Sequence, residues 1–94
     1  IEVDFPALKF DMEESDVLVL FSDGLTEYKN SDGEDFDKNM LMTSLQNSGY
    51  KSARRILESI TTDLKAFVKD VPQQDDITIL VLKRKKEADY IPEL

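Results

Sequence analysis

The pattern of apolar and polar residues predicts three strands. Residues 1–10 alternate between the two types until Pro6 interrupts the alternation. Because proline removes a backbone donor, we expect an edge strand with a bulge or break at Pro6. The unbroken apolar run at 17–21, and the run at 77–82, which is apolar except for Thr78, are too short for helices and contain β-branched residues. They predict two strands that are buried in the complete fold.

Two helices are predicted between these apolar runs. Asp37 is a favourable N-cap for a helix over 38–47, and Gly49 is its expected end. Ser52 opens a longer helix that Pro72 closes off. Apolar residues in this second helix recur at the i, i+3, i+4, i+7 spacing of an amphipathic helix, namely Ala53, Ile56, Leu57, Ile60, Leu64, Phe67 and Val68.

The predicted order β-β-α-α-β indicates a layered α+β fold. One helix runs down and the next runs up between 17–21 and 77–82, so we expect these strands to be antiparallel neighbours. Both strands are apolar on both faces, a pattern that requires cover on both sides. Two helices can cover only one face. We therefore expect the other face to be covered by a partner or by a preceding part of the domain, and in the isolated chain by a second copy, giving a homodimer.

Composition and charge limit the classes of function. The 94 residues allow one domain, and no apolar run is long enough to span a membrane. The net charge of −8 makes nucleic-acid binding a poor fit, and the one basic stretch, 83–86, is expected to be a solvated strand end. With no Cys and no His, disulfides, thiolate or imidazole metal sites and Ser-His-Asp triads are excluded. The chain begins at Ile1 rather than Met, so we expect a piece of a larger protein.

Three carboxylates form the main candidate site. Asp23 follows the strand at 17–21, and Asp75 and Asp76 precede the strand at 77–82. If these strands are antiparallel neighbours, the three side chains meet at one edge of the sheet. A hard divalent cation such as Mg²⁺ or Mn²⁺ would relieve their repulsion and activate a water. From spacing alone, an ordinary Asp-Gly turn and an acidic strand cap are slightly favoured, so both interpretations stay open.

Two other motifs fail on particular residues. The stretch 22–26 is similar to the Asp-x-Asp-Gly-Thr loop of haloacid-dehalogenase phosphatases, but Phe21 stands where the nucleophilic Asp is needed. The stretch 30–35 suggests a calcium loop, but a bidentate Glu at the required distance after Gly33 is missing. We interpret 30–35 as a turn.

Two motifs carry a family resemblance. Residues 18–27, Leu-Val-Leu-Phe-Ser-Asp-Gly-Leu-Thr-Glu, resemble the "SDGLTE" strand-turn of the metal-dependent (PPM, 2C-type) serine/threonine protein phosphatases. Residues 74–82 resemble the closing "QDDITLLVL" strand of the bacterial branch typified by stage II sporulation protein E and the general-stress sigma-factor regulators. The two motifs stand in the right order, and the helices between them are similar too.

The resemblance implies a fold, a partial site and a cofactor. The family's domain is an α-β-β-α sandwich with antiparallel sheets, and residues 1–94 would be the C-terminal segment of one such domain, with 83–94 as a charged tail. Asp23 and Asp75 would be metal ligands, and Asp76, at the Asn position of the eukaryotic motif, a further one. Gly24 would allow close backbone approach at the site. Two Mn²⁺ or Mg²⁺ ions would complete the domain's site, and no residue of this chain has another catalytic role.

The resemblance also implies an activity and a substrate. The parent protein would hydrolyse phosphoserine or phosphothreonine on a regulatory protein, specifically an anti-sigma-factor antagonist, in the bacterial cytoplasm. The sequence leaves open whether membrane or sensor domains lie upstream. The family's N-terminal acidic motifs are absent from this chain, so we expect the isolated fragment to be inactive. Asp37 departs from the family, which often has Gly there, and Glu27 receives no ligand role. The alternative is a non-catalytic, degenerate phosphatase-like module for partner binding or dimerisation.

Overall fold

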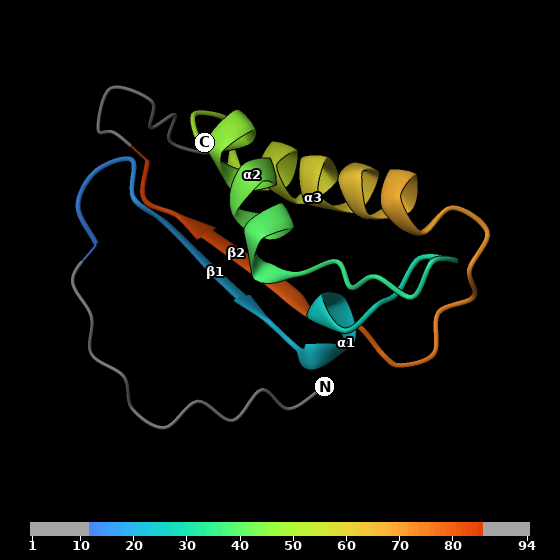
Figure 1. The fold of residues 1–94 in the computed structure, drawn as a ribbon. Coiled ribbons are helices and arrows are strands. Elements are labelled where there is room, and N and C mark those ends of the chain that lie inside the picture. Colours follow the sequence, from blue (N-terminus) through green and yellow to red (C-terminus); the bar gives the residue numbers. More distant parts are fainter. Residues whose placement is uncertain (1–11, 86–94) are drawn as a thin grey trace.

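A computed structural model describes residues 12–85 of the chain, and within them the elements follow the order β-α-α-α-β (Figure 1). The bounds of the elements are β1 (Val17–Phe21), α1 (Asp23–Thr26), α2 (Lys38–Ser48), α3 (Ala53–Val68) and β2 (Ile79–Lys83). The strand expected over 1–10 and most of the tail expected over 83–94 lie outside the described residues. The fold is of the α+β class, as predicted.

The two strands pair antiparallel, which confirms the prediction that the two apolar runs form neighbouring antiparallel strands. Their register joins Val17 to Lys83 at one end and Phe21 to Ile79 at the other. The second strand begins two residues later than expected, at Ile79. The physical reason lies at Thr78, whose backbone N–H donates to the side-chain oxygen of Ser22 instead of to a backbone carbonyl.

Both long helices begin and end close to the predicted residues. The side chain of Asp37 accepts from the backbone N–H of Met40 at 3.0 Å, and that of Ser52 accepts from Arg55 at 3.3 Å. These contacts satisfy N–H groups that the first helical turn leaves without partners. Gly49 caps the end of α2 as predicted. The helix α3 ends at Val68, with Lys69 as its C-cap at a φ of 51°, before Pro72 is reached.

The core lies between the two long helices and one face of the sheet (Figure 1). Phe36, on the loop before α2, is fully buried and packs edge-to-face on Phe67, with ring centroids 5.8 Å apart. The core-facing side chains of both strands pack against this cluster. The buried apolar residues are Leu25, Phe36, Leu41, Ile56, Ile60, Leu64 and Val68.

The opposite face of the sheet carries four leucines, Leu18, Leu20, Leu80 and Leu82, which we call the leucine face. The register places Leu18 beside Leu82 and Leu20 beside Leu80. Leu80 is 38% and Leu82 40% exposed, and α2 and α3 lie on the other side of the sheet (Figure 1). Within the described residues, the helices therefore cover one face only, as the two-sided apolar pattern predicted.

Lys83 extends β2 into the stretch that we expected to be charged tail. Its ammonium group turns toward the connection between α2 and α3. There it donates to the carbonyl oxygens of Gly49, at 2.9 Å, and Lys51, at 2.6 Å. Lys83 thus ties the end of the sheet to the end of α2 rather than extending freely into solvent.

Candidate functional site

The chain leaves β1 through a short helix where the sequence predicted only a turn. Ser22 occupies its N-cap position, and Asp23 lies in its first and only complete turn. Two residues on, Leu25 is fully buried and holds the helix against the core. The burial of Leu25 fixes the orientation of α1, and Asp23 is left exposed at the end of the strand.

Backbone contacts bring the two acidic motifs together. The N–H of Ser22 donates to the carbonyl of Thr78 at 3.0 Å, and the hydroxyl of Ser22 accepts from the N–H of Thr78 at 2.9 Å. One residue further along, a Cβ added to Gly24 would lie only 2.1 Å from the carbonyl oxygen of Asp76. A glycine is therefore required where α1 meets the segment before β2. Asp23 and the Asp75–Asp76 pair consequently lie at the same edge of the sheet, as the topology predicted.

The three carboxylates are exposed and carry charge that no described cation balances, which are two properties that would suit a hard cation. Asp23, Asp75 and Asp76 are all exposed, and none of them takes part in an ion pair with another described residue. Exposed, uncompensated carboxylate oxygens are the ligands that Mg²⁺ and Mn²⁺ prefer. Yet within residues 12–85 no three acidic side chains gather closely enough to hold a metal ion. The two motifs share this edge, but their three carboxylates do not form a cluster of metal ligands within the described residues.

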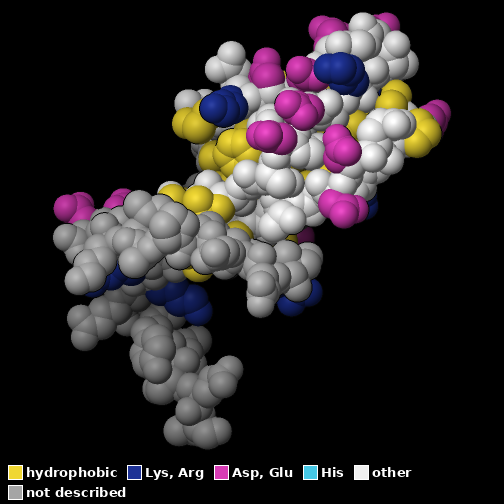
Figure 2. Space-filling model, turned by 90° about the horizontal axis from the view of Figure 1, so that it is seen from below, with side chains coloured by type: hydrophobic (Ala, Val, Ile, Leu, Met, Phe, Trp, Pro, Cys, Tyr) yellow, Lys and Arg dark blue, Asp and Glu magenta, His cyan; other side chains and the backbone are white. Residues whose placement is uncertain are grey.

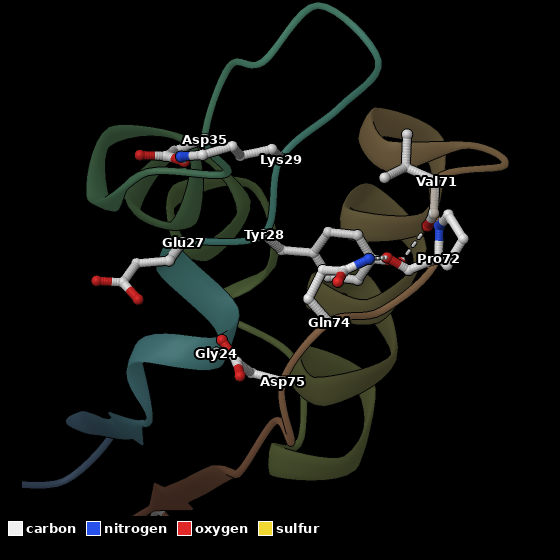
Figure 3. Close-up of a pocket in the computed structure, with 9 residues that line it drawn as sticks. All are labelled: Gly24, Glu27, Tyr28, Lys29, Asp35, Val71, Pro72, Gln74 and Asp75. Carbon is white, nitrogen blue, oxygen red and sulfur yellow. Dashed lines mark hydrogen bonds and ion pairs between the residues drawn. The ribbon is translucent and has the colours of Figure 1, made fainter.

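A pocket of about 380 Å³ opens beside the acidic edge (Figure 3). Gly24 and Asp75 form the wall nearest the candidate site. The hydroxyl of Tyr28 donates to the carbonyl of Val71 and thereby connects the end of the first motif to the loop after α3. An ion pair between Lys29 and Asp35 closes another side. The full lining is Gly24, Glu27, Tyr28, Lys29, Asp35, Val71, Pro72, Gln74 and Asp75.

The stretch 30–35 is a turn, as predicted. The side-chain oxygen of Asn30 accepts from the backbone N–H groups of Asp32 and Glu34, each at 3.0 Å, and Gly33 adopts a φ of 77°. The Asn30 oxygen is thus engaged by the turn itself. This loop presents the Lys29–Asp35 ion pair to the pocket.

Two structural features near the site were missed by sequence reasoning. The side chain of Ser22 accepts a hydrogen bond from Thr78 and so joins the two motifs. The hydroxyl of Tyr28 donates one to Val71 beside the pocket. Only the positions of these residues in the sequence could have drawn attention to them, because Ser22 directly precedes Asp23 and Tyr28 directly follows the motif at 18–27. Neither contact follows from periodicity, since each joins residues more than forty positions apart.

Acidic side chains are prominent on one face of the described residues. Figure 2 shows acidic side chains distributed over the upper part of one face, with fewer basic ones among them. None of the helices within residues 12–85 combines the length and the apolar character needed to cross a bilayer.

Comparisons with known proteins agree with the motifs. Residues 1–85 match the family of stage II sporulation protein E (SpoIIE). The chain is also 32% identical over 87 residues to the phosphoserine phosphatase RsbU of Bacillus subtilis (strain 168). That alignment covers 90% of this chain and 25% of the relative, so the chain spans about a quarter of the relative's length. No solved structure gives a significant match. With the two acidic motifs side by side and the match extending over nearly the whole chain, this protein belongs to the SpoIIE family.

Proposed function

We propose that the full-length protein containing this chain is a metal-dependent phosphatase that removes phosphate from phosphoserine or phosphothreonine on a regulatory protein. The observation that carries the proposal is the close approach of the Asp23–Gly24 and Asp75–Asp76 segments at one edge of the sheet. Family membership and the similarity to a phosphoserine phosphatase support the same reaction class.

In this proposal the chain supplies part of the metal site. Asp23 and Asp75 would hold Mn²⁺ or Mg²⁺, with Asp76 as a further ligand, and Gly24 leaves room for the two segments to meet. The ions, when bound, would supply a water activated for in-line attack on phosphorus. Asp23, Asp75 and Asp76 would contribute negative charge at the edge of the sheet where the two motifs meet. The remaining ligands would come from parts of the full-length protein outside residues 12–85, because these residues hold no group of three acidic side chains.

The substrate and the compartment rest on the family resemblance. We propose a phosphorylated anti-sigma-factor antagonist as the substrate protein and the bacterial cytoplasm as the place of the reaction. The pocket beside Gly24 and Asp75 could receive residues that flank the phosphorylated side chain, because it opens next to the acidic edge.

A non-catalytic role is the second candidate function. It would be favoured by a full-length sequence that lacks the family's other acidic motifs. In that case the chain would be a degenerate phosphatase-like module that binds partners or dimerises. The full-length sequence decides between the two, because a catalytic protein must carry further acidic motifs outside this chain.

The direct test measures phosphate release from a phosphoserine protein by the full-length protein, with Mn²⁺ and after removal of metal by EDTA. We expect turnover that EDTA abolishes and Mn²⁺ restores, and that Asp23→Asn or Asp75→Asn removes with little loss of fold. Asp32→Asn makes the same chemical change on an exposed turn residue and should leave turnover intact. Metal-independent turnover, or full turnover by Asp23→Asn, would contradict the proposal. If Asp76→Asn proves more damaging than Asp75→Asn, the assignment within that pair is reversed.

A further inference from the structure

We propose that Ser22 is a positioning residue, whose hydroxyl holds the Asp23 and Asp75–Asp76 segments at the separation that metal binding requires. The inference deepens the proposed function and rests on it. Ser22 belongs to the first motif but is not one of the proposed metal ligands.

Ser22 makes two hydrogen bonds to a single residue of the other motif. Its backbone N–H donates to the Thr78 carbonyl at 3.0 Å, and its hydroxyl accepts from the Thr78 N–H at 2.9 Å. In a regular antiparallel ladder, the second of these bonds would go to the backbone carbonyl of the residue opposite. Here that carbonyl instead accepts from the N–H of Leu25, at 3.0 Å, in the turn that opens α1.

The hydroxyl therefore resolves a conflict between strand and helix. The Ser22 carbonyl accepts from α1, and the Ser22 side-chain oxygen accepts from the Thr78 N–H in its place, so the strands stay paired up to the site. Both residues are half-buried, and a donor left without a partner there would be costly. Asp23 directly follows Ser22, and Asp76 precedes Thr78 by two residues, on the side where Gly24 approaches the Asp76 carbonyl.

Ser22 and Gly24 thus act at either side of Asp23. The hydroxyl of Ser22 holds the two segments together, and the missing side chain of Gly24 lets them approach. Loss of the Ser22 hydroxyl should release the Thr78 N–H and let the Asp75–Asp76 segment move relative to Asp23. The expected consequence is weaker metal binding, with the three carboxylates themselves unchanged.

The test compares Ser22→Thr with Ser22→Val in the full-length protein. These two side chains have nearly the same shape, and only threonine keeps the hydroxyl. Two quantities are measured for each variant, the Mn²⁺ dissociation constant by equilibrium titration and the hydrogen-exchange rate of the Thr78 amide without metal. Thermal unfolding reports the integrity of the fold, and Ser22→Ala repeats the loss of the hydroxyl without added bulk if Ser22→Val fails to fold.

We expect Ser22→Val to raise the Mn²⁺ dissociation constant about tenfold, the lower end of the range for residues that orient metal ligands. It should also speed exchange at Thr78, while Ser22→Thr restores both quantities. Equal Mn²⁺ affinity for the threonine and hydroxyl-free variants would overturn the inference. Asp23→Asn, measured in parallel, distinguishes a failure of the proposed function from a failure of the role of Ser22. If it leaves Mn²⁺ binding intact, the proposed function fails; if it abolishes binding and Ser22→Val does not, only the role of Ser22 fails.

Discussion

Gly24 shows how a single residue at the site acts through the absence of a side chain. Its Cα faces the Asp76 carbonyl so closely that an added Cβ would lie 2.1 Å away, inside any acceptable contact. The obstructing atoms belong to the backbone, which cannot rotate aside like a flexible side chain. Gly33 is a different case, because nothing lies within 4 Å of its added Cβ and its φ of 77° alone disfavours other residues.

This difference gives a matched pair of substitutions. We expect Gly24→Ala to cost about 1–3 kcal/mol of unfolding free energy through overpacking, and to abolish metal-dependent phosphatase activity of the full-length protein by displacing Asp76. Gly33→Ala should cost a similar amount, about 1–2 kcal/mol, through backbone strain, and should leave activity in place. Chemical denaturation and phosphate release measure the two effects. An active Gly24→Ala variant would show that the close approach is not required for function.

Sequence reasoning at the residue scale located the acidic positions but not their surroundings. Asp23, Asp75 and Asp76 could be placed at one edge because strand direction follows from the number of intervening helices. The hydroxyl contact of Ser22 could not be predicted, because it depends on α1 engaging the carbonyl of Ser22. The metal-ligand assignment itself stays a prediction.

At the scale of elements, capping residues explain the accuracy of the predicted helices. Asp37 and Ser52 each accept a backbone N–H of the first turn, so both helices begin where the sequence predicted. The four-residue helix α1 was missed because it is too short to show a periodic pattern. The role of Lys83 was missed for another reason. A lysine in a basic stretch gives no indication that it will donate hydrogen bonds to carbonyl groups of the distant α2–α3 connection.

Lys83 is expected to stabilise the contact between β2 and the α2–α3 connection. Replacing it with methionine keeps much of the aliphatic stem but removes the bonds to Gly49 and Lys51. We expect Lys83→Met to lower the unfolding free energy by about 1–3 kcal/mol, the usual contribution of hydrogen bonds from a charged donor, reduced by partial exposure. Lys85→Met removes an exposed lysine from the same stretch and serves as the control. Equal stabilities for the two variants, measured by urea denaturation, would contradict the structural role of Lys83.

At the scale of the whole molecule, the leucine face predicts self-association of the isolated chain. At one end of this face the backbone of Asp16 pairs with that of Arg84. A two-fold axis parallel to the strands would place each aspartate over the arginine of a second copy. Two strands make a sheet only about 10 Å wide. The contact is therefore smaller than the roughly 800 Å² per partner of a stable interface, and we expect a weak dimer.

Sedimentation equilibrium at micromolar concentrations tests this prediction. The isolated chain should show a concentration-dependent dimer, and Leu80→Lys should shift it to monomer without unfolding it. Leu57→Lys alters a leucine of similar exposure on α3, 36% against 38%, and should leave association unchanged. A well-folded, soluble monomer of the unsubstituted chain at these concentrations would contradict the predicted self-association through the leucine face.

The isolated chain is also expected to lack phosphatase activity. Residues 12–85 present exposed carboxylates at one edge but no group of three that could hold a metal ion. We therefore expect the purified 94-residue chain to release no appreciable phosphate from a phosphoserine peptide with Mn²⁺, under conditions in which the full-length protein is active. Manganese-dependent turnover comparable to that of the full-length protein would mean that this chain carries a complete site.

The central claim is that residues from the ends of two strands, Asp23 and Asp75, serve one metal site. A double-mutant cycle of Mn²⁺ affinity in the full-length protein tests it most directly, using Asp23→Asn, Asp75→Asn and the combination of both. Ligands of a shared site act as a unit, so we predict that each single change weakens Mn²⁺ binding strongly and that the second change adds much less than it does alone. Independent, additive effects, or a single variant with unaltered Mn²⁺ affinity, would contradict the claim that the two strand ends build one site.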